Sequence, residues 1–139
     1  MEIKPVTTGF SVAEQLTEDD LVTLKEAGYR TVICNRPDGE AEGQPTAHRL
    51  AARAQELGLA WYWIPVAPGN FTEEAQASFN EVLCEAAEPV LAFCRTGTRS
   101  ITLWALSQAE QVPAQQLIDQ AAEAGYDLVK CAPQFKQPE

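Results

Sequence analysis

The sequence has few of the residues that bind metal ions. Its only histidine is His48, and its four cysteines lie far apart with no CxxC pair: Cys34, Cys84, Cys94 and Cys131. Because zinc sites need closely spaced cysteine and histidine ligands, we expect no metal site, and no cofactor is indicated.

Positive charge is also scarce. Ten basic residues stand against 20 acidic ones, a net charge of −10, so we expect neither nucleic acid nor a membrane surface as a partner. No apolar run has the length of a membrane helix, and the start MEIKPVTTGFSV lacks the basic and apolar regions of a secretory signal. We therefore expect a cytoplasmic protein, whose thiols are reduced.

What is present fits one folded domain. The chain has 139 residues, of which 45% are apolar and 22% charged, values typical of a globular domain with a real core. There are no repeats, low-complexity tracts or linkers, so residues 1–139 are predicted to form a single domain.

Helical and extended patterns alternate along the chain. The patterns and capping residues predict helices over residues 18–27, 46–57, 72–87, 99–108 and 113–124, and strands over 8–12, 30–35, 60–66 and 90–93. The tail beyond Val129 is expected to be irregular. This alternation predicts an α/β fold of three layers, a mostly parallel sheet with helices on both faces. The bulky strand 60–66 is expected to be covered on both sides, with Trp61 and Trp63 in the core.

The segment LAFCRTGTRS, residues 91–100, places Cys94 directly after a buried strand and before a helix. Ligands bind outside the carboxyl ends of parallel strands, so Cys94 is at a site position. Backbone N–H groups of the loop and the helix dipole favour an anion there, and Gly97 permits the turn. Arg99 can hold the anion with its planar fork. We therefore expect Cys94 to be a nucleophilic thiolate; the alternative is an inert, buried thiol.

Other polar residues are candidates for binding the same anion. Arg95 and Arg99 are two of only ten basic residues, and both lie in this loop. Arg36 follows the strand 30–35 at the same predicted edge. The expected anion-binding set is Arg95, Thr96, Gly97, Thr98, Ser100 and Arg36, although capping of the helix by Ser100 is an equally good explanation of that residue.

The hexamer CRTGTR matches the rhodanese active-site loop, C-R-x-G-x-R or -T, and resembles the phosphatase loop C-x5-R-S/T shortened by one residue. The remaining segments, GFSVAEQLTEDDLVTLKEAGYRTVICNRPDGE, GLAWYWIPVAPGNFTEE and PVLAFCRTGTRS with LWAL, resemble a bacterial family, the phosphatase-like domain of beta-lactamase-hydrolase-like proteins, over about residues 9–106. The resemblance implies a protein tyrosine phosphatase-like scaffold and sulfurtransferase activity. It also implies a persulfide dioxygenase as a candidate partner, here a separate chain.

The nucleophile can attack sulfur or phosphorus. Phosphatases of this scaffold use an aspartate after the strand 60–66, but that loop reads APGNFTEE, and its first carboxylates belong to a predicted helix start. Without an acid an alkoxide leaves poorly, whereas sulfane transfer needs none. We therefore expect a sulfurtransferase that forms a Cys94 persulfide, taking sulfur from thiosulfate or glutathione persulfide and giving it to a thiol, cyanide or sulfite. The alternatives are a phosphatase with a Cys94 thiophosphate and a non-catalytic oxyanion or redox sensor.

A few residues have auxiliary roles to weigh. Cys34 is either a resolving thiol for Cys94 or a core cysteine. Asp38 or Glu40 could replace the missing acid, or Asp38 could simply hold a turn. Cys84 is expected to be buried in its helix and inert.

Overall fold

The protein, described by a computed structural model over residues 1–136, has one sheet of five strands within that range. The sheet order is β1-β2-β5-β3-β4. The strands are β1 (Lys4–Thr7), β2 (Phe10–Ala13), β3 (Thr31–Cys34), β4 (Ala60–Trp63) and β5 (Val90–Phe93). All are parallel to their neighbours except β1, which runs antiparallel to β2.

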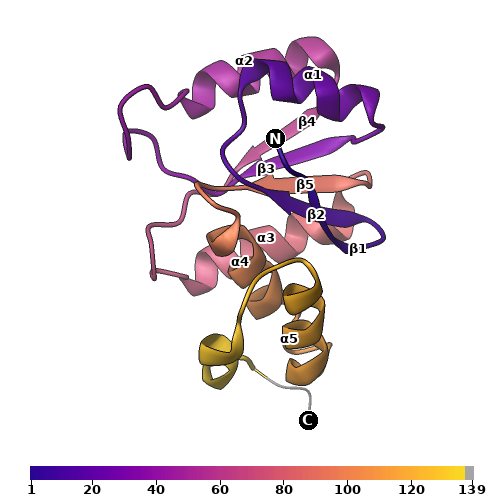
Figure 1. The fold of residues 1–139 in the computed structure, drawn as a ribbon, viewed down its shortest axis with the longest axis vertical. Helices are drawn as coiled ribbons and strands as arrows, with labels where there is room; N and C mark the ends of the chain where they lie inside the picture. The colour runs from indigo at the N-terminus through magenta and orange to yellow at the C-terminus, as the bar shows by residue number, and fades with distance from the viewer. Residues whose placement is uncertain (137–139) are drawn as a thin grey trace.

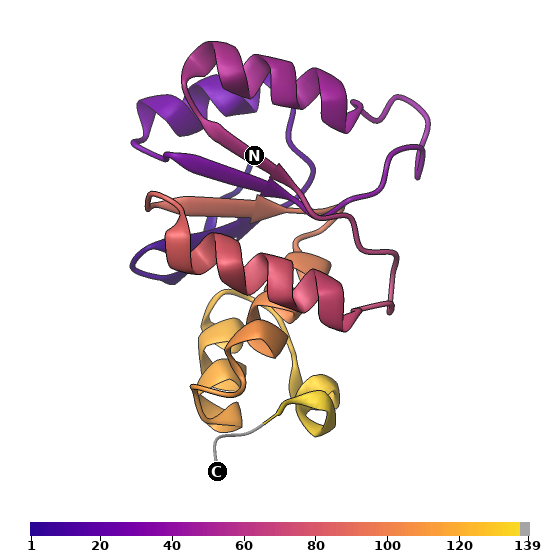
Figure 2. The same cartoon turned by 180° about the vertical axis from the view of Figure 1, so that it is seen from behind.

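Helices cover both faces of this sheet. They are α1 (Glu18–Glu26), α2 (Ala47–Leu57), α3 (Glu73–Glu85), α4 (Thr98–Gln108) and α5 (Ala114–Glu123), followed by the 3₁₀ helix η1 (Val129–Gln134). In Figures 1 and 2, α1 and α2 lie above the sheet, and α3, α4 and α5 lie below it. The predicted three-layer, mostly parallel α/β fold is confirmed.

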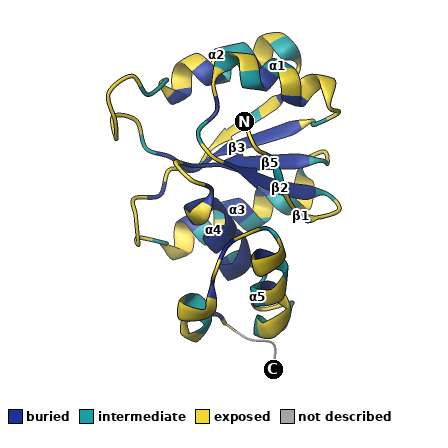
Figure 3. Ribbon diagram, in the orientation of Figure 1, coloured by how far each residue is buried: buried dark blue, intermediate teal, exposed yellow. Residues whose placement is uncertain are grey.

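The apolar run of β5 shows why the sheet lies in the middle. Val90 and Ala92 belong to the core shared with α3, α4 and α5, while Leu91 and Phe93 belong to the core shared with α1 and α2. Successive strand side chains point to opposite faces, so a strand covered on both sides must be apolar throughout. Figure 3 shows the central strands buried and the outer faces of the helices exposed.

Threonine caps explain where three helices begin. Thr17, Thr46 and Thr72 each accept a backbone N–H of the following turn with their side-chain oxygen. Helix α2 ends at Gly58, whose φ of 78° is in the left-handed region. These boundaries agree with the sequence prediction to within a few residues.

The predicted burial of the strand over residues 60–66 is wrong. The strand ends at Trp63, and β4 lies at the sheet edge, so only one side of it has a neighbouring strand. Trp63 is 47% exposed and Tyr62 39% exposed, whereas Trp61 is half-buried and packs against Phe93. Bulky aromatic residues fit a half-buried edge strand as well as a core strand, which is why the pattern misled.

Three smaller predictions also differ from the structure. Strand β1 was not predicted; it pairs at the other edge of the sheet, where a strand can contain a proline such as Pro5. The tail beyond Val129 is not irregular throughout, because residues 129–134 form η1. Cys84 is exposed on α3 rather than buried. No helix within residues 1–136 is both long and apolar enough to cross a membrane.

Candidate active site

The carboxyl ends of β5, β3 and β4 meet at one edge of the sheet. Figure 2 shows these strands pointing toward the side from which the loops after β3 and β4 extend. Asn35, after β3, donates its backbone N–H to the Phe93 carbonyl at 2.8 Å. Val66, after β4, donates its backbone N–H to the Asn35 carbonyl at 3.0 Å. The backbone therefore brings the segments after β3 and β4 beside the end of β5, and the prediction that Arg36 and Cys94 follow strands at the same edge is confirmed.

Cys94 is almost fully buried, with 1% of its surface exposed. Its sulfur accepts the backbone N–H of Gly97 at an N···S distance of 3.1 Å. Gly97 has a φ of 94° and forms the N-cap of α4, so the positive end of the α4 dipole is next to the sulfur. An N–H donor and a helix N-terminus both favour negative charge on this atom.

Arg99, in the first turn of α4, is buried and bridges the loops after β3 and β4. Its guanidinium donates to both Glu40 carboxylate oxygens, at 2.9 and 2.8 Å, and to the Val66 carbonyl at 2.8 Å. The hydrogen bonds to Glu40 raise the pKa of Arg99, and its proximity to Cys94 acts in the same direction. Arg99 is therefore a fixed cation beside the cysteine, and its predicted role in holding an anion stays a prediction.

Glu40 is the carboxylate that holds the arginines together. Besides its two bonds from Arg99, it accepts Nε of Arg36 at 2.9 Å. The hydrogen bond from Arg99 lowers the pKa of Glu40 below its usual range, and the bond from Arg36 adds to this effect. A carboxylate in this position stays ionised near neutral pH and cannot act as a proton donor there.

Arg36 also contacts the segment after β2. Its Nη1 donates to the Gln15 side-chain oxygen at 3.0 Å, and the Gln15 backbone N–H donates to the Arg95 carbonyl at 3.3 Å. Arg36 is buried. Arg36 therefore lies near Cys94, as predicted, but its hydrogen bonds go to Glu40 and Gln15, which connect it to Arg99 and to the Cys94 loop.

The buried hydroxyl of Ser100 donates to the Asn35 side-chain oxygen at 2.8 Å. The Asn35 amide in turn donates to the Ile64 carbonyl at 2.9 Å. The N-cap of α4 is Gly97, so the expectation that Ser100 caps this helix is wrong. Its hydroxyl instead links α4 to the ends of β3 and β4.

The remaining residues of the loop are exposed. Thr96 and Thr98 hydroxyl oxygens lie 3.0 Å apart, and both residues are exposed, as is Arg95. They line the outer part of the loop around the buried Cys94. Their predicted contribution to anion binding stays a prediction.

Cys34 and Asp38 lie near the site but have partners of their own. The Cys34 thiol donates to the Arg36 carbonyl at an S···O distance of 3.5 Å, and burial raises its pKa to about 12. Cys34 packs within the core on the α1 and α2 side. Asp38 accepts the Ala47 backbone N–H at 2.8 Å, a local role at the start of α2.

Two contacts of the site have no clear signal in the sequence. Glu40 pairs with Arg36 and Arg99, but its i,i+4 spacing from Arg36 signals a contact only within a helix, and residues 36–40 lie in a loop. Tyr126 donates its hydroxyl to the Thr96 carbonyl at 2.8 Å. It lies 30 residues beyond that threonine, and no local pattern predicts such a contact.

The described residues hold no metal-binding cluster. Among residues 1–136, no three histidine, cysteine, aspartate or glutamate side chains are placed to hold a metal ion together. The site itself offers a buried cysteine, an arginine fork and backbone N–H groups.

Comparison with protein families identifies the scaffold. Residues 2–111 match the family described as beta-lactamase hydrolase-like protein, phosphatase-like domain. The chain belongs to this family. A beta-lactamase hydrolase-like protein of Xylella fastidiosa is 32% identical over 108 residues, which cover 78% of this chain and 25% of that protein. The chain spans only 25–30% of the length of the curated relatives it matches.

Solved structures agree with this membership. A candidate phosphatase from Neisseria meningitidis has a TM-score of 0.85, with 32% identity over 96% of both chains. The core catalytic domain of a PP-IP phosphatase from S. cerevisiae has a TM-score of 0.70 at 12% identity, covering 96% of this chain and 85% of that one. The second likeness shows the fold alone. The phosphatase-like domain thus has a protein tyrosine phosphatase-like α/β scaffold.

Proposed function

We propose that this phosphatase-like domain is a sulfurtransferase that carries sulfane sulfur on Cys94. The donor is a small anion, thiosulfate or glutathione persulfide, and the acceptor is a thiol, cyanide or sulfite. A persulfide dioxygenase is the proposed protein partner, on the family resemblance alone. The acidic chain, with a net charge of −10, is unsuited to nucleic acid or membrane surfaces, and the proposed location is the cytoplasm.

The state of Glu40 carries this proposal. A phosphate monoester with an alcohol leaving group needs a proton donor, which contributes about 10²–10⁴ in rate. Glu40 is held ionised by Arg99 and Arg36, Asp38 is engaged at α2, and Glu73 and Glu74 lie in the first turn of α3. Sulfane transfer expels sulfite or a thiolate and needs no such donor.

In the first step the Cys94 thiolate attacks the outer sulfur of thiosulfate. A new S–S bond forms on Cys94 while the donor S–S bond breaks, and its electron pair leaves with sulfite. The Gly97 N–H, which already contacts the Cys94 sulfur, and Arg99 stabilise the negative charge at this position. With glutathione persulfide, the leaving group is glutathione thiolate.

In the second step the acceptor attacks the terminal sulfur of the persulfide. With cyanide, a C–S bond forms, the Cys94 S–S bond breaks, and thiocyanate leaves while Cys94 returns to the thiolate. No net oxidation or reduction of the protein occurs. Arg99 and the α4 N-terminus again face the thiolate that is released.

A phosphatase is the second candidate, and the scaffold is the observation that favours it. The fold is shared with phosphatases such as the yeast PP-IP enzyme, and Cys94 with Arg99 reproduces the nucleophile and anion clamp in a loop shortened by one residue. In that reaction Cys94 would carry a thiophosphate. The lack of an acid predicts that only phosphate esters with good leaving groups react.

Measuring sulfur transfer and phosphate ester hydrolysis with the same protein preparation distinguishes a sulfurtransferase from a phosphatase. Thiocyanate formation from thiosulfate and cyanide is compared with hydrolysis of an aryl phosphate and an alkyl phosphate. Cys94→Ser is the inactive variant, and Cys84→Ser, at an exposed cysteine of α3, is the matched control. We expect thiocyanate formation that depends on Cys94 and not on Cys84.

Two results would contradict the proposal. Alkyl phosphate hydrolysis that exceeds thiocyanate formation would establish the phosphatase instead. Absence of turnover on every substrate, with Cys94 still reactive toward alkylating agents, would favour the non-catalytic oxyanion- or redox-sensing module.

A further inference from the structure

One peptide unit joins Cys94 to Tyr126. The N–H of the Thr96–Gly97 peptide contacts the Cys94 sulfur at 3.1 Å, and the carbonyl of the same peptide accepts the Tyr126 hydroxyl at 2.8 Å. In a planar trans peptide the N–H and the C=O point in opposite directions. Holding the carbonyl toward Tyr126 therefore aims the N–H toward Cys94.

The Thr96–Gly97 peptide could rotate easily, because Gly97 restricts its own φ very little. Gly97 has a φ of 94°, and glycine occupies both positive and negative φ at little cost. The sequence of the loop alone therefore leaves the orientation of the Thr96–Gly97 peptide weakly determined. A contact from outside the loop is needed to select one orientation.

Tyr126 is well placed to supply that contact. The residue is buried, Lys4 Nζ lies 4.7 Å from the centre of its ring, and a Cβ on Gly97 would overlap its hydroxyl oxygen. Burial raises the pKa of Tyr126, so the hydroxyl keeps its proton and remains a donor at neutral pH. Tyr126 follows α5, beyond residue 111 where the family match ends.

We propose that Tyr126 is a positioning residue for the nucleophile, holding the Thr96 carbonyl so that the Gly97 N–H is fixed on the Cys94 sulfur. The hydroxyl also polarises this amide, because hydrogen bonds in a chain strengthen one another. Tyr126 does not touch the substrate in this role. The part that concerns sulfur turnover rests on the proposed function, whereas the effect on the Cys94 thiolate does not.

Other titratable groups face the Cys94 sulfur or the Tyr126 hydroxyl and must stay in place during a test. Arg99 faces it from α4, and Cys34 interacts with it from β3. Lys4 and Glu14 interact with Tyr126 from β1 and from the segment after β2. Tyr126→Phe keeps all four residues in the chain, and of these only Lys4 loses a hydrogen-bond partner, the Tyr126 hydroxyl.

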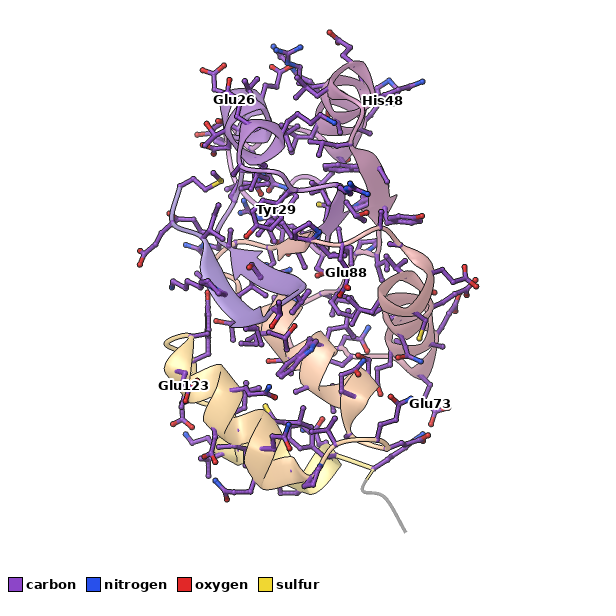
Figure 4. All side chains as sticks on the ribbon, turned by 90° about the vertical axis from the view of Figure 1, so that its right-hand side faces the viewer. Glu26, Tyr29, His48, Glu73, Glu88 and Glu123 are labelled. Carbon is purple, nitrogen blue, oxygen red and sulfur yellow. The ribbon has the colours of Figure 1, made fainter. Side chains whose placement is uncertain are left out.

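Tyr126→Phe removes the hydroxyl and keeps the ring. Tyr29→Phe is the matched control, because the Tyr29 hydroxyl donates to Ser11 Oγ at 3.0 Å and Tyr29 packs against the core on the α1 and α2 side, whereas Tyr126 belongs to the core on the other face of the sheet. Tyr29 is labelled in Figure 4. The rate of Cys94 alkylation by iodoacetamide is followed against pH by peptide mass analysis. Thermal unfolding of both variants verifies that each is folded.

We expect Tyr126→Phe to slow alkylation at pH 7 by about three- to tenfold and to move the alkylation profile to higher pH. Tyr29→Phe should leave the profile unchanged. In thiocyanate formation, kcat should fall while KM for thiosulfate stays within about twofold, because Arg99 is untouched.

An alkylation profile of Tyr126→Phe that coincides with that of Tyr29→Phe would overturn the positioning role. A shifted profile in a protein that shows no sulfur turnover would retain the role and reject the sulfurtransferase proposal. The two ideas can thus fail separately.

Discussion

The ends of β3 and β5 each carry a buried cysteine, yet their surroundings differ. Cys34 and Phe93 are register partners, so Cys34 and Cys94 follow each other closely along one edge of the sheet. The Cys34 thiol donates to a backbone carbonyl and burial raises its pKa to about 12. The Cys94 sulfur accepts a backbone N–H and faces Arg99. The two cysteines are almost equally buried, so our proposal that Cys94 alone is the nucleophile rests on the N–H donor and the arginine at its sulfur.

The largest expected effect is the difference between the alkylation rates of Cys34, at the end of β3, and Cys94, after β5, in the native protein. At pH 7 Cys34 is almost entirely a thiol because burial raises its pKa to about 12, whereas the Cys94 sulfur accepts a backbone N–H and lies beside Arg99, so Cys94 should react about 10³-fold faster or more. Iodoacetamide labelling with peptide mass analysis gives both rates in one sample. Comparable rates for Cys34 and Cys94 would refute the distinction and restore Cys34 as a resolving thiol.

Replacing Arg99 or Arg36 by lysine compares the β5 end of the sheet with the β3 end. Arg99→Lys loses the planar fork that binds Glu40, Val66 and the anion, and we expect turnover to fall about 10²-fold. Arg36→Lys, at the β3 end, acts through Glu40 and should cost only about tenfold. Steady-state kinetics with thiosulfate measures both. Equal losses in the two variants would mean that Arg36 binds substrate as directly as Arg99.

Glu40→Gln should have the smallest effect and a defined pH dependence. Because the pKa of Glu40 is lower in the folded than in the unfolded protein, its carboxylate stabilises the fold at neutral pH, and this contribution is lost as the pH falls below about 4. Because Glu40 is exposed and solvent screens its ion pairs, we expect the free energy of unfolding to drop by only about 1 kcal/mol at pH 7 and the difference to vanish at low pH.

Urea unfolding at several pH values measures this difference. Glu42→Gln, at an exposed position of the same loop, is the matched control and should have little effect at any pH. A loss for Glu40→Gln that persists unchanged at pH 3 would show that packing rather than charge is responsible.

The parts of this fold that follow local rules were predictable. The apolar runs of β3 and β5, the threonine caps of α1, α2 and α3, and the strand–loop–helix arrangement around Cys94 all depend on neighbouring residues. The site position of Cys94 follows from the same pattern. Sheet order does not, so the exposed edge position of β4 and the pairing of β1 were not predicted.

The contacts that complete the site are long-range. Glu40 meets Arg99 across 59 residues, and Ser100 meets Asn35 across 65. Tyr126 reaches the loop from a segment after α5. Each of these contacts depends on how helices and strands pack in three dimensions. The residues of one loop therefore cannot reveal such a contact, even where the individual elements are well predicted.

The central claim is that Cys94 carries sulfur, and the intact mass of the protein tests it most directly. The reduced protein is exposed briefly to glutathione persulfide, with Cys94→Ser alongside. The account predicts a gain of one sulfur atom on the wild-type protein only, released by added thiol. An equal gain on Cys94→Ser, or no gain on a wild-type protein whose Cys94 still alkylates rapidly, would contradict it.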